Sequence, residues 1–324
     1  MNILYILGNG FDKAQGMKTS YPEFYQYLLD NTEGGSSLLQ KMKKEIKKDM
    51  DEGKHLWSDM EWAFGNFTEN VQSEDELEEL HYEVSRHLQT YLKEQNKSFI
   101  PNPEQINRFL SEFQNPGSFI QATDAERYKK FIRTLSDGKY YYVMSLNYTD
   151  TLEKLLGLKP SGTKRTFSGS SQLIDICHVH GRLDSTIIFG VDNIGQIKNT
   201  VLRAKDAIKY FMVKEDSNLA MKNTRHSICE NYISEANIIV LFGVSIGETD
   251  ARWWKLIGKE LKKRKNLAIV DFVYCPNDVP PDRLYRMAMV ENRSKQDMLK
   301  KMGLSEEEET ERLFFVINSS MFSA

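Results

Sequence analysis

Cysteine is scarce in this sequence, and its distribution excludes two kinds of stabilised site. The chain of 324 residues has three cysteines, Cys177, Cys229 and Cys275, and no CxxC pair. Three scattered thiols make neither a disulfide framework nor a zinc site built from cysteine pairs. We therefore expect a fold held together by apolar burial in a reducing compartment, with the cytoplasm as the expected location.

Long apolar runs and an excess of one charge are also missing. The longest nearly apolar run, residues 238–246, is far too short to span a membrane, and no basic region precedes the apolar run near the N-terminus. The 43 basic and 46 acidic residues give a net charge of −3, which disfavours nucleic acid as a partner. With 40% apolar and 27% charged residues, the composition is that of a globular protein with no membrane association.

Short apolar runs typical of β-strands alternate with helical stretches. The expected strands cover residues 2–7, 140–146, 173–178, 186–189, 237–242, 267–274 and 313–317. Helices are expected from Tyr21, where Ser20 and Glu23 have capping-box spacing, and over residues 151–156, 227–235 and 250–263. This alternation predicts an α/β fold that is Rossmann-like, with a mainly parallel sheet and helices on both faces.

Residues 33–137 have a different character. Apolar residues recur there at helical spacing, as over residues 77–92, and strand-like runs are few. Lysines in the stretch 41–52 are interleaved with acids at i,i+4 spacing, which is typical of a solvated helix face rather than a nucleic-acid site. We expect a helical insertion at 33–137, while 1–32 and 138–324 form one Rossmann-type nucleotide-binding domain.

Two glycine-containing segments directly follow expected strands. The first consists of Gly8, Asn9, Gly10, Phe11 and Asp12. The second contains Gly243, Ser245 and Asp250. Glycines at a strand end let the backbone approach a phosphate, and free amides can then donate to it. Taken alone, the first segment is better explained as a tight turn with Asp12 capping a short helix. The alternative for the second is a capped helix start, with Thr249 or Asp250 as the cap.

Polar residues with catalytic potential follow two further strands. Asn147 has the donors and the acceptor needed to orient a water or a sugar hydroxyl, although Asn147 and Asp150 are also common helix caps. His178 and His180 should share a face, and a histidine at a strand end suits a general base. A metal is the alternative for this pair, without an apparent third ligand, and His178 alone is better explained as a structural histidine. All four segments are expected at one edge of the parallel sheet.

In this order the segments GNGFD, NYT-D, H-x-HG and FG-x-S-x-GE-x-D resemble the bacteriophage abortive-infection AbiH family. The stretches LGNGFDKAQGMKTSYPEF and FGVSIGETDARWW look especially like it, and WSDME at residues 57–61 also looks like a motif of that family. The resemblance spans residues 8–254. It implies an anti-phage function whose toxic activity is held off until infection.

AbiH proteins in turn look like distant relatives of the sirtuins and of sirtuin-like NAD-hydrolysing defence proteins. By that resemblance NAD is the substrate, no metal is expected, Asn147 positions water and the nicotinamide ribose, and His180 is the base. The residues predicted to bind the dinucleotide are Gly8, Asn9, Gly10, Phe11, Asp12, Asp150, Gly243, Ser245 and Asp250. The chain cannot build the four-cysteine zinc module of sirtuin deacylases, so NAD hydrolysis is favoured over protein deacylation.

Other functions stay open on the sequence alone. The same pocket would serve a non-catalytic module that senses NAD or ADP-ribose, and His178, His180 and a carboxylate would serve a metal-dependent hydrolase or nuclease. Asp59 and Glu61 are two residues apart and would not share a helix face, so at most one is expected to reach the site directly. A phage trigger and a homo-oligomer are compatible with the sequence, which specifies neither.

Overall fold

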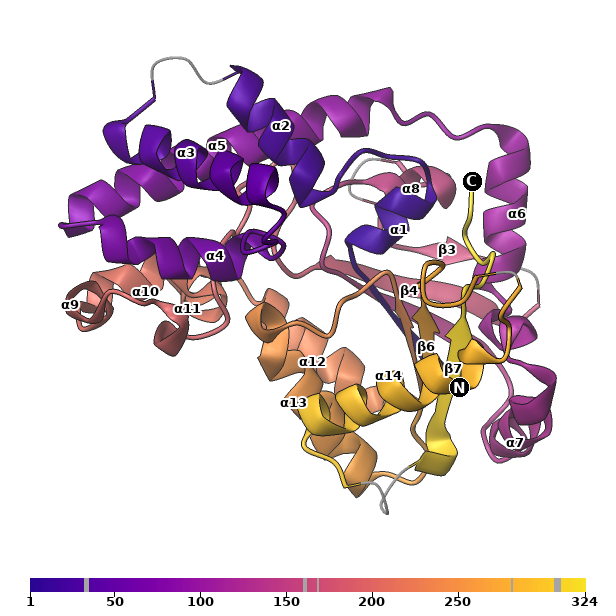
Figure 1. The fold of residues 1–324 in the computed structure, drawn as a ribbon. Helices are drawn as coiled ribbons and strands as arrows, with labels where there is room; N and C mark the ends of the chain where they lie inside the picture. The colour runs from indigo at the N-terminus through magenta and orange to yellow at the C-terminus, as the bar shows by residue number, and fades with distance from the viewer. Residues whose placement is uncertain (32–34, 160–161, 168, 281, 306–309) are drawn as a thin grey trace.

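The computed structural model describes residues 1–31, 35–159, 162–167, 169–280, 282–305 and 310–324 (Figure 1). Seven strands form one sheet in the order β3-β4-β2-β1-β5-β6-β7. The strands are β1 (Asn2–Leu7), β2 (Lys139–Ser145), β3 (Arg165–Thr166), β4 (Ser171–His178), β5 (Ile238–Phe242), β6 (Ala268–Val273) and β7 (Leu313–Ile317). Neighbours pair in parallel except β3, which is antiparallel to β4. The predicted Rossmann-like α/β class is confirmed.

Alternating apolar residues along the strands bury both faces of the sheet. In β1, Tyr5 belongs to the core on one face and Leu4 to the core on the other. The first face is covered by α1 (Asn9–Ala14), α6 (Pro103–Phe113), α7 (Ala122–Ile132) and α8 (Thr151–Leu155). The second is covered by α12 (Arg225–Glu235), α13 (Ala251–Lys263) and α14 (Arg286–Met302). Helices on both faces follow from strands that are apolar on both sides.

A third apolar core lies beside the sheet, in a helical part of the molecule (Figure 1). Its main helices are α2 (Tyr21–Asn31), α3 (Ser37–Glu52), α4 (Met60–Phe67) and α5 (Glu74–Ser98). Residues between 183 and 213 complete this core, near the short helices α9 (Thr200–Arg203), α10 (Asp206–Met212) and α11 (Lys214–Ala220). Of the expected insertion, α3 to α5 build this part, whereas α6 and α7 cover the sheet. The expected boundary between residues 32 and 33 lies outside the described residues.

The strand expected at 186–189 is absent, and that prediction was wrong. These residues run as irregular backbone, and the following Val191 makes an isolated bridge to Val213. Ile187 and Phe189 are nevertheless buried, in the core of the helical part. The apolar run therefore signalled burial correctly but not a place in the sheet, because short apolar runs do not distinguish a strand from another buried segment.

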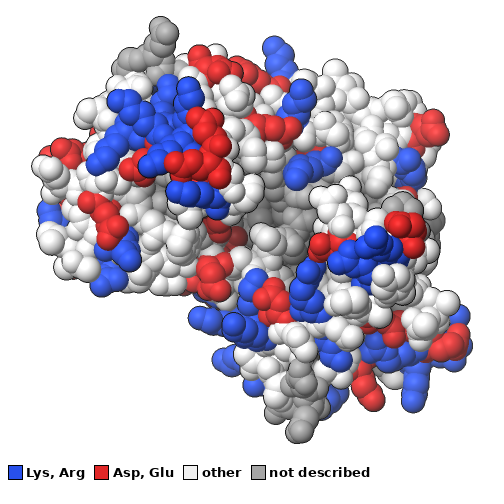
Figure 2. Space-filling model, in the orientation of Figure 1, with Lys and Arg blue, Asp and Glu red and all other residues white. Residues whose placement is uncertain are grey.

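None of the helices in the described part of the chain has the length and apolarity that crossing a bilayer requires. Lysine and arginine side chains are interspersed with aspartate and glutamate over the face drawn in Figure 2. This mixture fits the near-balanced charge of the whole sequence.

The strand order creates a switch point between β1 and β5. From β1 the chain continues to β2 and β4 on one side, and it later returns to β5 on the other side of β1. Connections that leave neighbouring strands in opposite directions open a crevice at the carboxyl ends of those strands. In open α/β sheets this crevice is the usual place for a ligand.

Candidate active site

A cavity of about 200 Å³ lies at this switch point, between the sheet and the helical part. It is lined by Gly8, Asn9, Asp12, Thr19, Tyr21, Phe24, Ser58, Asp59, Glu61, Leu88, Leu92, Leu146, Asn147, Tyr148, Thr149, His180, Gly243, Val244, Ser245, Thr249 and Asp250. All the residues predicted from the sequence line it except Gly10, Phe11 and Asp150. Segments that follow β1, β2, β4 and β5 therefore converge on one space.

Three glycines bring the ends of β1 and β5 together. A Cβ atom on Gly10 would lie 2.4 Å from the Gly243 Cα, and Gly243 itself has a φ of +66°. The Gly10 N–H donates to the Gly243 carbonyl at 2.8 Å, and the Gly8 N–H donates to the Phe242 carbonyl at 3.1 Å. The amides of Gly8 and Gly10 are thus already bonded, and the expectation that they are free to hold a phosphate was wrong. These glycines allow two backbones to cross closely.

Asn147 and Asp12 line the cavity beside the crossing of β1 and β5. The Asn147 Nδ2 donates to the Gly8 carbonyl at 3.0 Å, which fixes the plane of the amide. The Asp12 Oδ2 accepts a hydrogen bond from the Thr149 hydroxyl at 2.6 Å. Burial raises the pKa of Asp12 to about 6, although the Thr149 hydrogen bond opposes the rise. Asp12 is consequently a buried carboxylate that titrates close to neutral pH.

His180 lies in the cavity wall with 3% of its surface exposed. Its Nε2 lies 3.2 Å from the Asp250 Oδ1. Burial and the positive charge of Lys214 lower the pKa of His180, against the opposing effect of Asp250. The imidazole is therefore neutral at pH 7, which is the protonation state that a general base must have.

His178 has partners of its own, and of the two histidines only His180 lines the cavity. Strand β4 ends at His178, so His180 lies beyond the strand. The His178 Nδ1 lies 2.8 Å from the Asn147 carbonyl oxygen, and its Nε2 lies 2.9 Å from the Glu153 Oε1. Both ring nitrogens thus have protein partners, as expected of a structural histidine. Among the described residues no group of three or more His, Cys, Asp or Glu side chains has a metal-binding arrangement.

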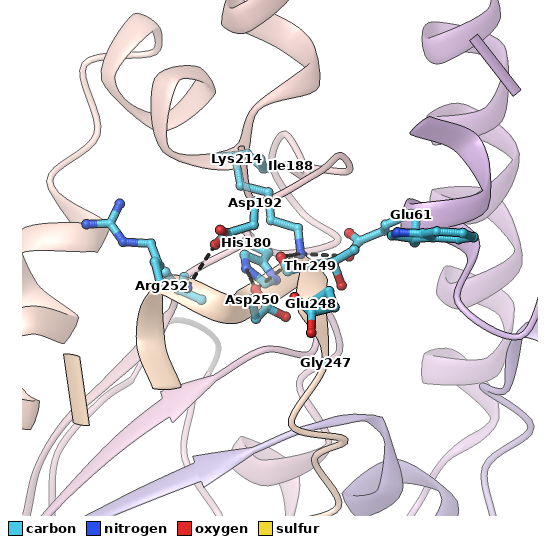
Figure 3. A network of polar contacts seen from close by, with 12 residues as sticks. Glu61, His180, Ile188, Asp192, Lys214, Gly247, Glu248, Thr249, Asp250 and Arg252 are labelled. Carbon is cyan, nitrogen blue, oxygen red and sulfur yellow. Dashed lines mark hydrogen bonds and ion pairs between the residues drawn. The ribbon is translucent and has the colours of Figure 1, made fainter. Parts of the chain in front are cut away.

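Lys214 joins the two parts of the molecule at the cavity, and nothing in the sequence singled it out. Its ammonium lies 2.6 Å from the Glu61 Oε2 and 3.2 Å from the Asp250 Oδ1, and it donates to the Thr249 carbonyl at 3.0 Å (Figure 3). Glu61 comes from α4 in the helical part, whereas Thr249 and Asp250 follow β5. A lysine at the start of a charged helix is ordinary in a sequence, so only the contacts reveal its position.

The charges in this network depend on one another. Burial alone would lower the pKa of Lys214, but Asp250 and Glu61 raise it above its usual value. Burial would raise the pKa of Asp250, but Lys214 brings it down to about 2. Burial raises the pKa of Glu61 to about 7, although Lys214 lowers it. At neutral pH the ammonium and the Asp250 carboxylate are therefore charged, and Glu61 titrates.

Both Asp59 and Glu61 line the cavity, which corrects the expectation that at most one would reach it. Asp59 is the N-cap of α4 and has extended backbone, with φ −112° and ψ 102°, so helical spacing does not apply to it. Its Oδ1 accepts from the Trp62 N–H at 3.0 Å, and its Oδ2 accepts from the Thr249 hydroxyl at 3.3 Å. The cap thereby ties α4 to the segment after β5.

The contacts of Phe11 and Asp150 indicate structural roles for both residues. Phe11 is 1% exposed and packs in the sheet core, with its ring centroid 5.6 Å from that of Phe322. Asp150 is the N-cap residue of α8, and its Oδ1 lies 3.0 Å from the Lys154 ammonium. The core position anchors α1 in the sheet, and the cap position is the alternative that the sequence allowed for Asp150.

A protein-family model matches most of the chain. The family model described as "Bacteriophage abortive infection AbiH" matches residues 4–272, a range that contains every residue of the cavity wall. No curated protein matches the chain.

Proposed function

The chain belongs to the AbiH family of bacteriophage abortive-infection proteins, and we propose that it hydrolyses NAD at the bond between nicotinamide and ribose. Membership of the family supports an anti-phage, abortive-infection role. The proposed products are nicotinamide and ADP-ribose. Loss of NAD stops the metabolism of an infected cell, which would connect this chemistry to the family's role.

The observation that carries the proposal is the convergence of strand-end segments on one acidic cavity. Asn147 and His180 lie in its wall together with the carboxyl groups of Asp12, Glu61 and Asp250. Cleavage of an N-riboside develops positive charge on the ribose, as in glycoside hydrolysis. A site lined with fixed carboxylates stabilises positive charge on the ribose, which is uncharged in the ground state.

The reaction does not require the protein to protonate the leaving group. Nicotinamide in NAD is bound through a positively charged ring nitrogen, so it leaves with the bonding electron pair as a neutral molecule. The oxygen of one water then bonds to the anomeric carbon, and the water loses a proton to a base. We assign His180 as that base because it is neutral at pH 7 and lies in the wall. Asn147, fixed by its bond to the Gly8 carbonyl, orients the water or a ribose hydroxyl.

The direct test is incubation of the purified protein with NAD, followed by chromatography of nicotinamide and ADP-ribose. His180→Ala should lower nicotinamide release about 100-fold or more, since a general base typically contributes 10²- to 10⁴-fold. Asn147→Ala should lower it by about 100-fold, since the water or ribose hydroxyl loses its orientation. His87→Ala is the matched control, because His87 lies on α5 and does not line the cavity. If both folded site variants release nicotinamide at the wild-type rate, these roles are wrong.

An inactive purified protein needs a second step before the function is rejected. The assay is then repeated with extract from phage-infected cells as the source of a trigger. Titration calorimetry with NAD and ADP-ribose runs beside it. Binding of either nucleotide without cleavage under both conditions would favour a nucleotide sensor over a hydrolase.

A further inference from the structure

One oxygen of the Asp12 carboxylate lacks a hydrogen-bond partner in good geometry within the described part of the chain. Asp12 is 2% exposed and lines the cavity. Its Oδ2 accepts the Thr149 hydroxyl at 2.6 Å, whereas its Oδ1 has no partner in hydrogen-bond geometry among the described residues. Thr151 and Asn147 lie close enough to lower the pKa of Asp12. A buried carboxylate oxygen without a partner is costly, so proteins rarely keep one without a use for it.

The backbone around Asp12 prevents this oxygen from turning away. Phe11, the preceding residue, is fixed in the sheet core, and Gly10 is pressed against Gly243 at the β1–β5 crossing. The hydrogen bond from Thr149 holds the other oxygen. The side chain is therefore held in the cavity wall by both of its neighbours in sequence and by a partner from the segment after β2.

The charge of the cavity wall indicates what the free oxygen meets. Asp12, Asp59, Glu61 and Asp250 line the cavity, and no described lining residue is a lysine or arginine. The ammonium of Lys214 behind the wall is already bonded to Glu61 and Asp250. Such a space repels a phosphate and attracts a cation.

The size of the cavity also indicates that the pyrophosphate of a dinucleotide does not enter it. Its volume of about 200 Å³ is below the roughly 300–1,000 Å³ of pockets that enclose a whole drug-sized ligand. It is suited to a base with its ribose rather than to a complete dinucleotide. The pyrophosphate of a dinucleotide would then remain outside the acidic wall, near the exposed Ser245.

We propose that the free Oδ1 of Asp12 contacts the positively charged ribosyl centre, and that the cavity selects N-ribosides whose base carries a positive charge. This deepens the proposed function and rests on it for the reaction. As the bond between the anomeric carbon and nitrogen breaks, positive charge moves from the base to the ribose, and the fixed carboxylate stabilises it there. No covalent bond to Asp12 is required. A pKa of about 6 leaves Asp12 ionised at pH 7.

The test uses two probes that differ in charge and little in shape: nicotinamide riboside, a cation, and its neutral dihydro form. Titration calorimetry should show that the wild-type protein prefers the cation by about 10- to 100-fold, as expected for a hydrogen-bonded charged contact. Asp12→Asn keeps the side-chain shape and should lose most of that preference. Nicotinamide release from NAD should fall about 100-fold in the same variant. Asp206→Asn, an exposed carboxylate on α10, is the control and should match the wild type.

A third measurement covers the case in which Asp12→Asn does not fold. Thr149→Val removes a hydrogen bond that stabilises ionised Asp12, so the acid limb of activity or of cation binding, expected near pH 6, should move to higher pH. Equal affinity of the wild type for both probes, wild-type behaviour of Asp12→Asn, or an unmoved acid limb in Thr149→Val would each overturn the assignment. Preference for the cation that Asp12→Asn abolishes, in a protein that cleaves no NAD, would reject the hydrolase and keep the Asp12 contact.

Discussion

Replacing Lys214 by methionine removes the positive charge that contacts the carboxyl groups of Glu61 and Asp250 in the network of Figure 3, while keeping a side chain of similar length. The ammonium is 3% exposed and lies within 3.2 Å of both carboxylates. Breaking a buried ion pair from one side typically costs about 3–5 kcal/mol, because the remaining charge is buried without compensation. We expect a loss of this size at pH 7, and a fall of about 6–10 °C in Tm.

The loss should depend on pH in a defined direction. In the wild type the folded pKa of Glu61 is raised to about 7, so its contribution to stability is present below its unfolded value near 4.5 and disappears as the pH rises through 7. Without Lys214 the folded pKa of Glu61 is higher still. The two proteins therefore lose stability in parallel up to pH 7, and above pH 7 only the variant continues to lose it. The difference should grow by up to about 1.4 kcal/mol per pH unit.

Urea unfolding at pH 6, 7, 8 and 9 measures this difference. Lys209→Met is the matched control, because Lys209 forms an exposed ion pair with Asp206 within α10. This variant should leave the unfolding free energy unchanged. In the double variant Lys214→Met/Glu61→Gln the pH dependence above 7 should disappear. A loss of stability below about 1 kcal/mol, or one that is constant from pH 7 to 9, would refute the conclusion that Lys214 compensates the buried charges of Glu61 and Asp250.

Two further predictions concern the sheet. Burial raises the pKa of Asp271 in β6 to about 7, so its contribution to stability is lost as the pH rises from about 4 to 7. Asp271→Asn removes this loss. The change that Asp271→Asn makes in the unfolding free energy should therefore be more favourable at pH 8.5 than at pH 3.5, by up to about 4 kcal/mol. Equal effects of Asp271→Asn at the two pH values in urea unfolding would contradict this. Gly243→Ala should cost at least about 3 kcal/mol or prevent folding, because its Cβ would lie 2.3 Å from the Phe11 nitrogen at a φ of +66°. Gly16→Ala is the control, because Gly16 has a φ of +78° and no atom of the described residues lies within 4 Å of the new Cβ; it should cost only about 1–2 kcal/mol. Equal losses of stability in the two variants would show that the close contact at Gly243 is unimportant.

Much of the fold was predictable because its signals are local. Apolar runs of strand length marked β1, β2, β4, β5, β6 and β7, and the sequence between them had helical spacing. Polar residues after strand ends marked Asn147, His180 and Ser245, since parallel strands present their carboxyl ends at one edge. The order of the strands was not predicted, and it alone creates the switch point that brings these residues together.

The sequence by itself determined the fold class and the strand ends that carry polar residues, because periodicity reports which face of an element is buried. Only the tertiary structure decided how the buried charges are compensated. Lys214, Glu61 and Asp250 come from three separate elements, and the backbone at Asp59 frees it from helical spacing. Likewise, the amides of Gly8 and Gly10 became unavailable to a phosphate only when β5 came to lie beside β1. The partner of a polar group is set by contacts between distant segments, and no local pattern contains that information.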